Sequence, residues 1–169
     1  MNVRRATAED ARGIAAIHVE SWRSAYHGIV PDEYLGSLSI DHREWFWRDA
    51  LDGTGPETWV AEENGEVRGW MSVAMSRDSD APPSTGELWA IYVHPTHWRR
   101  GVGQLLWDTA EEQLKHSGFT EVTLWVFKDN APALGFYRSN GFVAEHGEKT
   151  IRVGGTDLIE VRLRKQLGG

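Results

Sequence analysis

The chain has 169 residues, a formal net charge of −7 and no cysteine. The missing cysteines exclude a disulfide framework, a thiolate metal site and a thiol nucleophile, and the acidic balance argues against general nucleic-acid binding, which needs positive charge. An excess of acid suits a cationic substrate, although it also serves solubility. With no apolar leader and no membrane-length apolar run, we expect a single domain over residues 1–169 in a soluble, cytoplasmic protein.

The N-terminal third is predicted to be mainly helical. Thr7 suits the start of a helix, with Asp10 as its partner in a capping-box variant. Gly28 breaks this helix, and Pro31 suits the first turn of the next one. In chain order, the expected elements are a strand at 2–5 and helices at 7–24, 31–38 and 41–51.

The rest of the chain alternates strands with helices and ends in a hairpin. Asn64-Gly65 is a strong signal for a hairpin turn, and Asn130 suits a helix cap. Near the C-terminus, apolar residues alternate with charged ones, which is typical of a half-buried strand. The expected strands are 58–63, 66–76, 88–93, 121–127, 143–152 and 158–164, and the expected helices are 101–116 and 131–139. This order predicts a mixed sheet with helices on both faces.

A turn with two glycines, Gly101 and Gly103, connects the strand at 88–93 to the helix that follows. Such a turn aims several backbone N–H groups and the helix dipole at one point. That point is suited to a phosphate or pyrophosphate. Many strand–helix turns contain glycine for steric reasons alone. The turn therefore indicates a phosphate site only in combination with the motif about thirty residues later.

Residues 87–142 resemble the central motifs of the GNAT superfamily of N-acetyltransferases. In that family a Gln/Arg-x-x-Gly-x-Gly/Ala turn holds the pyrophosphate of acetyl-CoA; Gly101 and Gly103 match its small positions, whereas Trp98 replaces Gln or Arg. The second family pattern, Asn-x-x-Ala-x-x-Phe-Tyr-x-x-x-Gly-Phe, is met by Asn130, Ala133, Phe136, Tyr137, Gly141 and Phe142. The topology extends the resemblance to the whole chain.

The resemblance implies an α/β (α+β) fold with a mixed, mostly antiparallel sheet and a gap where the fourth and fifth strands splay apart. It implies acetyl-CoA as co-substrate and acetyl transfer to a primary amine of a small molecule or a peptide in a ternary complex. It leaves open whether the protein forms a homodimer. No metal is expected, because His18, Glu20 and the other histidines lack the spacing of metal ligands. The residues that the resemblance assigns to the coenzyme are Ile91, Tyr92, Val93, Arg99, Arg100, Gly101, Val102, Gly103, Gln104, Asn130 and Tyr137. The first three would contact the acetyl-pantetheine arm through their main chain.

Acyl transfer to an amine needs a proton donor for the leaving thiolate and a group that removes a proton from the ammonium. The resemblance assigns the donor role to Tyr137, which could instead simply pack beside Phe136. Glu87 is the first candidate for the base, unless it is an ordinary solvated strand-end carboxylate. Weaker candidates for the base are His94, His97, Glu20 and His27, and proton loss to water is a further alternative.

The acceptor site is predicted from aromatic residues. Trp22 and Tyr26 lie four residues apart on one helical face and would form walls of an amine pocket, where cation–π attraction favours a cation. The alternative is that they fasten the helix to the sheet. Trp125 would line the gap beside the acetyl group or belong to the core.

Three other functions remain open at this point. A transferase of a longer acyl group would keep the same fold and motifs. A non-catalytic coenzyme A-binding or regulatory module would keep only the phosphate turn. A dinucleotide-binding domain would need a third glycine at position 106, which is Leu106 here, and it fits poorly with the terminal hairpin.

Overall fold

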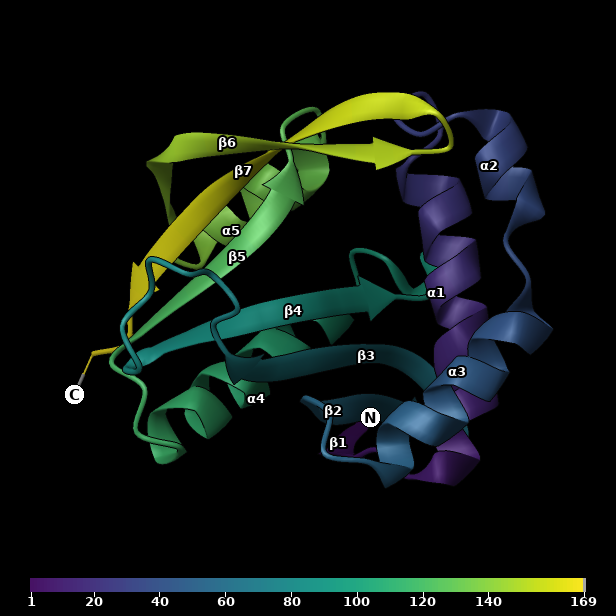
Figure 1. Ribbon diagram of the computed structural model, residues 1–169. Coiled ribbons are helices and arrows are strands. Elements are labelled where there is room, and N and C mark those ends of the chain that lie inside the picture. Colours follow the sequence, from purple (N-terminus) through teal and green to yellow (C-terminus); the bar gives the residue numbers. More distant parts are fainter. Residues whose placement is uncertain (169) are drawn as a thin grey trace.

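The computed structural model describes residues 1–168 and contains a seven-stranded sheet with helices on both faces (Figure 1). The strands are β1 (Asn2–Arg5), β2 (Glu57–Glu63), β3 (Glu66–Met75), β4 (Thr85–Val93), β5 (Glu121–Phe127), β6 (Val143–Val153) and β7 (Thr156–Gln166). Their order in the sheet is β1-β2-β3-β4-β5-β7-β6. The helices are α1 (Ala11–Ala25), α2 (Asp32–Ser37), α3 (Ile40–Asp52), α4 (Val102–His116) and α5 (Ala131–Ser139).

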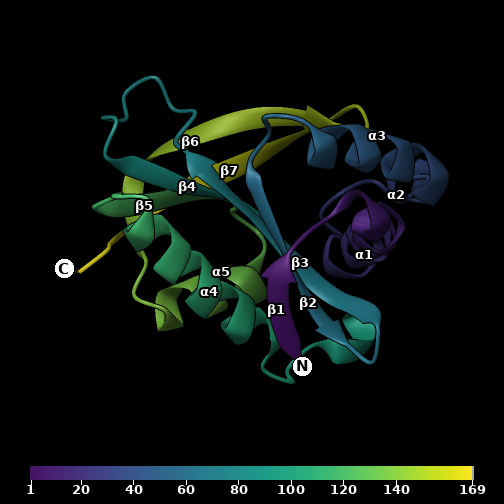
Figure 2. The same ribbon diagram turned by 90° about the horizontal axis from the view of Figure 1, so that it is seen from below.

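Two groups of helices cover the two faces of the sheet. α1, α2 and α3 lie on one face, and α4 and α5 lie on the other (Figure 2). The larger core joins α4 to the central strands and includes Leu106, Trp107 and Leu124. On the opposite face, α1 and α3 bury Ile14 and Trp47 against Trp70 of β3. Burial of these apolar surfaces is the main force that holds both layers to the sheet.

The sheet is antiparallel everywhere except between β4 and β5, which run parallel. These two strands pair only where Thr85–Glu87 faces Glu121–Thr123, so their remaining residues diverge. Their facing main-chain groups are thereby left without strand partners. The predicted α+β fold, with its mixed, mostly antiparallel sheet and splayed fourth and fifth strands, is confirmed.

The boundaries differ from the predicted ones by up to four residues, the largest difference being the start of α1 at Ala11 instead of residue 7. β4 begins at Thr85 instead of Leu88, because the pairing of β4 with β5 lies entirely in its first three residues. Two short 3-10 helices, Ala8–Asp10 and Pro95–His97, were not predicted. The turn at Asn64-Gly65 has positive φ at both residues (55° and 78°), as a tight hairpin requires.

The predicted capping interaction at the N-terminus is present and couples to an ion pair. The Thr7 amide donates to the Asp10 carboxylate (2.8 Å), which also accepts two hydrogen bonds from Arg4 (2.8 and 2.9 Å). Burial of Asp10 disfavours its charge, but the bonds from Arg4 and Thr7 outweigh this effect and lower its pKa. The charged carboxylate therefore stabilises the junction of β1 and α1.

An Asp10→Asn variant is expected to lose about 1–3 kcal/mol of unfolding free energy at pH 7, the usual worth of such charged hydrogen bonds. Because the pKa of Asp10 is lower in the folded state, this difference is complete above the unfolded pKa of about 4 and shrinks as the pH falls below it. Urea titrations at pH 7 and about pH 3 measure it. Asp49→Asn, at an exposed position on α3, is the control, and an equal loss for Asp10→Asn at both pH values would contradict the explanation.

Within residues 1–168, no helix is long and apolar enough to cross a membrane. The same residues contain no group of three or more His, Cys, Asp or Glu side chains placed to hold a metal ion.

Candidate functional site

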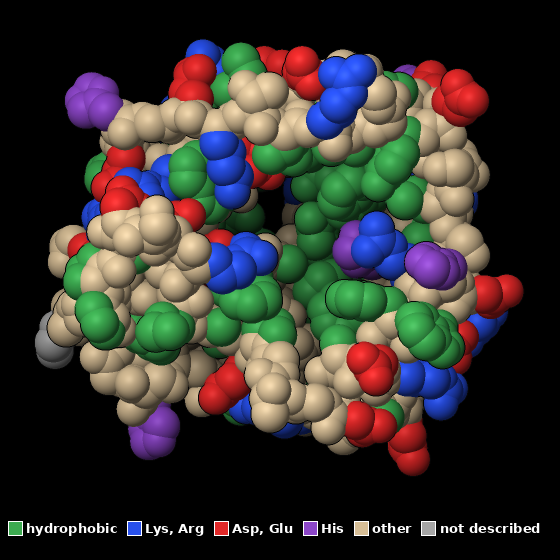
Figure 3. All heavy atoms as spheres, in the orientation of Figure 1, with side chains coloured by type: hydrophobic (Ala, Val, Ile, Leu, Met, Phe, Trp, Pro, Cys, Tyr) green, Lys and Arg blue, Asp and Glu red, His purple; other side chains and the backbone are tan. Residues whose placement is uncertain are grey.

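A cavity of about 790 Å³ lies where β4 and β5 separate. Residues from the end of α1, from β4 and the turn after it, from β5, α5 and the C-terminal hairpin line it. Figure 3 shows a hollow in the middle of this face, bordered mainly by hydrophobic side chains. The cavity reaches from the start of α4 to the aromatic cluster beneath α1.

The start of α4 forms one end of the cavity. Gly101 has a left-handed conformation (φ 83°), as does Arg99 just before it (φ 59°). The first N–H groups of a helix have no partner within the helix, so those of Val102, Gly103 and Gln104 point toward this end. A Cβ at Gly101 would meet no atom within 4 Å, so open space lies in front of the amides. The left-handed turn therefore leaves unpaired helix amides next to open space, an arrangement that can bind an anion.

Trp98, which departs from the family pattern, closes the turn against the end of β4. Its indole Nε1 donates to the Val93 carbonyl (2.8 Å), and the Ser21 hydroxyl donates to the same carbonyl (3.0 Å). Trp98 also lines the cavity. It therefore supplies a structural bond that fixes the turn without Gln or Arg at this position.

Tyr137 lies on α5 and faces the cavity. Its ring packs against Phe136 and Phe142, with centroid distances of 5.5 and 5.8 Å. Burial, together with the nearby Tyr92, raises the pKa of the Tyr137 phenol above its usual value. The phenol is thus protonated at neutral pH and able to donate a proton or a hydrogen bond. The two interpretations of this residue, aromatic packing and a proton donor, are compatible.

Asn130 also combines two interpretations. Its side-chain oxygen accepts from the Ala133 amide (3.3 Å) and so caps α5, as predicted. The same residue is buried and lines the cavity beside Tyr137. The cap fixes the start of α5 and with it the position of Tyr137.

Glu87 lies at the paired end of β4, away from the cavity lining. Its carboxylate is buried and accepts from the backbone amide of Arg77 (2.9 Å) and from the Arg77 guanidinium (2.5 Å). It is therefore not a solvated strand-end residue. The sequence did not predict this ion pair, because Arg77 lies in the loop that precedes β4.

Three of the four weaker candidates for the base are paired with a neighbouring side chain. His94 pairs with Glu20 (2.7 Å), and His27 pairs with Asp32 (3.0 Å) on the exposed surface. His97 lines the cavity at the end near Arg99. Of these four candidates, only His97 is a lining residue of the cavity.

The opposite end of the cavity is aromatic. Trp22 of α1 and Tyr26, which directly follows α1, line it, and Tyr26 packs edge-on against Trp22 and Phe127, each at 4.9 Å. The Tyr26 and Tyr92 hydroxyls are 3.4 Å apart. Trp22 and Tyr26 thus both line the cavity and fasten α1 to the sheet.

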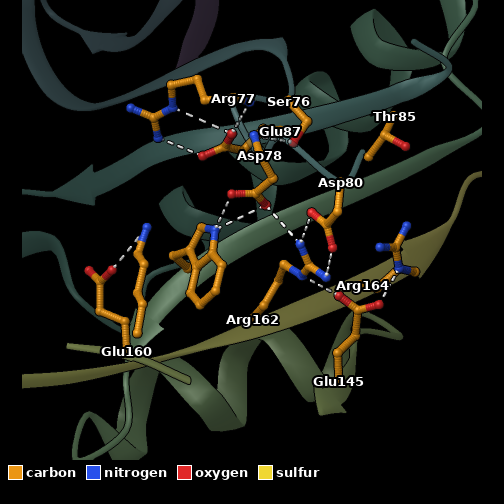
Figure 4. A network of polar contacts seen from close by, with 12 residues as sticks. Ser76, Arg77, Asp78, Asp80, Thr85, Glu87, Glu145, Glu160, Arg162 and Arg164 are labelled. Atoms are coloured by element: carbon orange, nitrogen blue, oxygen red, sulfur yellow. Dashed lines mark hydrogen bonds and ion pairs between the residues drawn. The ribbon is translucent and has the colours of Figure 1, made fainter. Parts of the chain in front are cut away.

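Trp125 of β5 lines the cavity. It is hydrogen-bonded to a polar network in which Arg162 lies between Asp78, Asp80 and Glu145 (Figure 4). Its Nε1 donates to Asp78 (3.0 Å), and Asp78 is paired with Arg162 (3.2 Å). Arg162 also pairs with Asp80 and Glu145. The indole is therefore held in a fixed orientation by the loop after β3.

Most of the predicted site residues come together in this cavity. Those that line it are Trp22, Tyr26, Ile91, Tyr92, Val93, Arg99, Gly101, Gly103, Gln104, Trp125, Asn130 and Tyr137. Glu87, Arg100 and Val102 do not, and the Val102 side chain is buried in the core.

Several lining residues were not predicted, above all Glu160 on β7. From sequence alone, the alternation in this strand predicts that its apolar residues are buried and that its charged residues face solvent. The sequence does show that Glu160, Arg162 and Arg164 share one face of β7. It does not show that this face lines the cavity.

A coenzyme A moiety suits the observed groups. The amides at the start of α4 and the guanidinium of Arg99 suit a pyrophosphate. The unpaired edges of β4 and β5 suit an extended amide-containing arm, which can bond as a strand would.

Comparisons with known proteins agree with this geometry. The model of the Acetyltransferase (GNAT) family matches residues 16–142. An uncharacterized N-acetyltransferase of Bacillus subtilis, YuaI, is 36% identical over 96% of this chain and 91% of its own. A spermidine N(1)-acetyltransferase of Thermoplasma acidophilum is 26% identical over 86% of this chain and 89% of its own. The crystal structure of the PaiA N-acetyltransferase of T. acidophilum with coenzyme A covers 98% of both chains, with a TM-score of 0.75 and 23% identity.

Proposed function

The chain belongs to the acetyltransferase (GNAT) family and is an N-acetyltransferase that uses acetyl-CoA, and we propose that it acetylates a primary amine by direct attack in a ternary complex. The acceptor is a small molecule or a peptide. The observation that carries this proposal is the cavity between β4 and β5, which joins the anion site at α4 to an aromatic pocket beneath α1. Two substrates can thus meet in one open channel.

Bound acetyl-CoA would supply a thioester carbonyl that is open to attack by an amine. The residues of the chain hold and orient the two partners. We assign the pyrophosphate to the amides of Val102, Gly103 and Gln104 with Arg99, and the pantetheine arm to the main chain of β4. These groups bind in the same way before and after the reaction, so they position the substrates and do not themselves move protons.

Tyr137 is proposed to donate its proton or a hydrogen bond to the departing thiolate. The raised pKa of its phenol keeps the group protonated at the pH of the reaction. Stabilisation of a leaving group by a positioned acid typically contributes two to four orders of magnitude, roughly 10²–10⁴, to the rate.

For the base, Glu87 stays the first proposal, acting through water. Its carboxylate is buried against Arg77 and lies outside the cavity lining, so a proton from the amine has to reach it indirectly. Proton loss to bulk water through the open cavity is the alternative.

The decisive experiment is thiol release from acetyl-CoA in the presence of polyamines, aminoglycosides, amino acids and peptides with free N-termini or lysines. The chain has no cysteine, so a thiol reagent detects only the coenzyme product. We expect release to rise with at least one class of amine and mass spectrometry to show the acetylated acceptor. Tight binding of coenzyme A without release for any amine would favour the non-catalytic module, and release only with longer acyl-CoA donors would favour the longer acyl group.

A further inference from the structure

The charged residues of the cavity are separated along its length. Arg99 lies at the end next to α4, where an anion is expected. Glu160 is the one carboxylate among the residues in the described part of the chain that line the cavity. Its neighbours there include Trp125 and Phe127, and Phe127 is its cross-strand partner. A single carboxylate within an aromatic wall is the arrangement that recognises an organic cation.

A lysine of the chain already places its ammonium group at this position. Lys149 of β6 lies with its Nζ 4.1 Å from the centroid of the Trp125 ring and 3.5 Å from the Glu160 carboxylate. Lys149 itself is not a lining residue, and its side chain is 43% exposed. The pair is long and its lysine is exposed to water, and such pairs contribute about 0–1 kcal/mol, so another ammonium group can replace that of Lys149 at little cost.

The other charges near Trp125 do not oppose a cation there. The Arg162 guanidinium lies 5.6 Å from the ring, but it is paired with the three carboxylates of Asp78, Asp80 and Glu145. Asp78 accepts from the indole Nε1, which increases the electron density of the ring and fixes its position. The local balance of charge is therefore favourable for a positive group.

An ammonium held by a carboxylate resists deprotonation, whereas the nitrogen that attacks a thioester has to be neutral. Glu160 is thus better suited to a charged group that stays charged than to the reacting amine. The acceptor then needs two nitrogens, one that reacts and one that is bound as a cation.

We propose that the acceptor is a diamine or a similar amine with a second positive group, and that this group binds between Glu160 and the Trp125 ring, where it displaces Lys149. The inference rests on the proposed acetyl transfer and names the class of its acceptor. Glu160 thereby sets specificity, and Lys149 acts as an internal competitor for the same position.

The test compares 1,4-diaminobutane with n-pentylamine, which replaces one ammonium by a methyl group at nearly the same length. Glu160→Gln is expected to raise the KM for the diamine by about tenfold and to leave that for n-pentylamine and for acetyl-CoA within about twofold. Lys149→Met is expected to lower the KM for the diamine by about two- to fivefold, because the competitor is gone. Lys128→Met, which makes the same charge change at a lysine paired with Glu148 on the same hairpin, is the control.

An unchanged ratio of the two KM values in Glu160→Gln, or equal effects of Lys149→Met and Lys128→Met, would overturn the subsite while the transferase stands. If the wild type acetylated no amine, the proposed function would fail instead. Calorimetry with 1,4-diaminobutane would then still test the subsite. Weaker binding to Glu160→Gln than to the wild type would support the subsite, and equal binding would overturn it.

Discussion

A Gly101→Glu variant is expected to bind coenzyme A at least about tenfold more weakly than the wild type. Gly101 has a φ of 83° at the start of α4 and borders the cavity, so a side chain there projects into open space beside the unpaired amides. The new carboxylate would occupy the anion site and repel a pyrophosphate. Isothermal titration calorimetry with coenzyme A measures the change, which corresponds to about 1.4 kcal/mol or more.

The matched control is Gly118→Glu at the other end of α4. Gly118 also has a positive φ (86°), and a Cβ there would likewise meet no atom within 4 Å, so the conformational strain and the added charge are alike. It lies outside the cavity lining. Equal losses of affinity in the two variants would show that strain or charge at a distance weakens binding, and would move the anion site away from Gly101.

The sequence predicted the elements of this fold well because hydrophobic periodicity and turn residues are local signals. Asn64-Gly65, the Thr7 cap and the Asn130 cap each act within a few residues, and the structure contains all three interactions. The glycine turn at α4 was predictable for the same reason: Gly101 adopts the left-handed conformation that few other residues tolerate.

The parts of the site that depend on distant segments were not predictable. A solvated strand-end carboxylate was one interpretation of Glu87, yet Arg77 reaches it from the preceding loop. On β7, the apolar residues of the alternating pattern were expected to be the buried ones, but Ile159 is 41% exposed and Glu160 lines the cavity. The alternation shows which residues share a face of β7. It does not show which face lines the cavity, because that depends on the insertion of β7 between β5 and β6.

A Tyr137→Phe variant is expected to lower kcat at saturating acetyl-CoA by at least about tenfold, within the range of a positioned general acid. The ring packs against Phe136 and Phe142, and phenylalanine keeps both contacts. The loss therefore reflects the hydroxyl group and not the shape of the pocket. Steady-state thiol release measures kcat, and calorimetry is expected to give a nearly unchanged Kd for coenzyme A.

Tyr34→Phe provides the control, since Tyr34 lies on α2 and outside the cavity lining. It removes a phenol at a distance from the site and is expected to leave kcat unchanged. A wild-type kcat in Tyr137→Phe would remove the acid role and leave this tyrosine as an aromatic support of α5. A fall in kcat together with a much weaker Kd would instead mean that the hydroxyl binds the coenzyme equally in the ground and transition states.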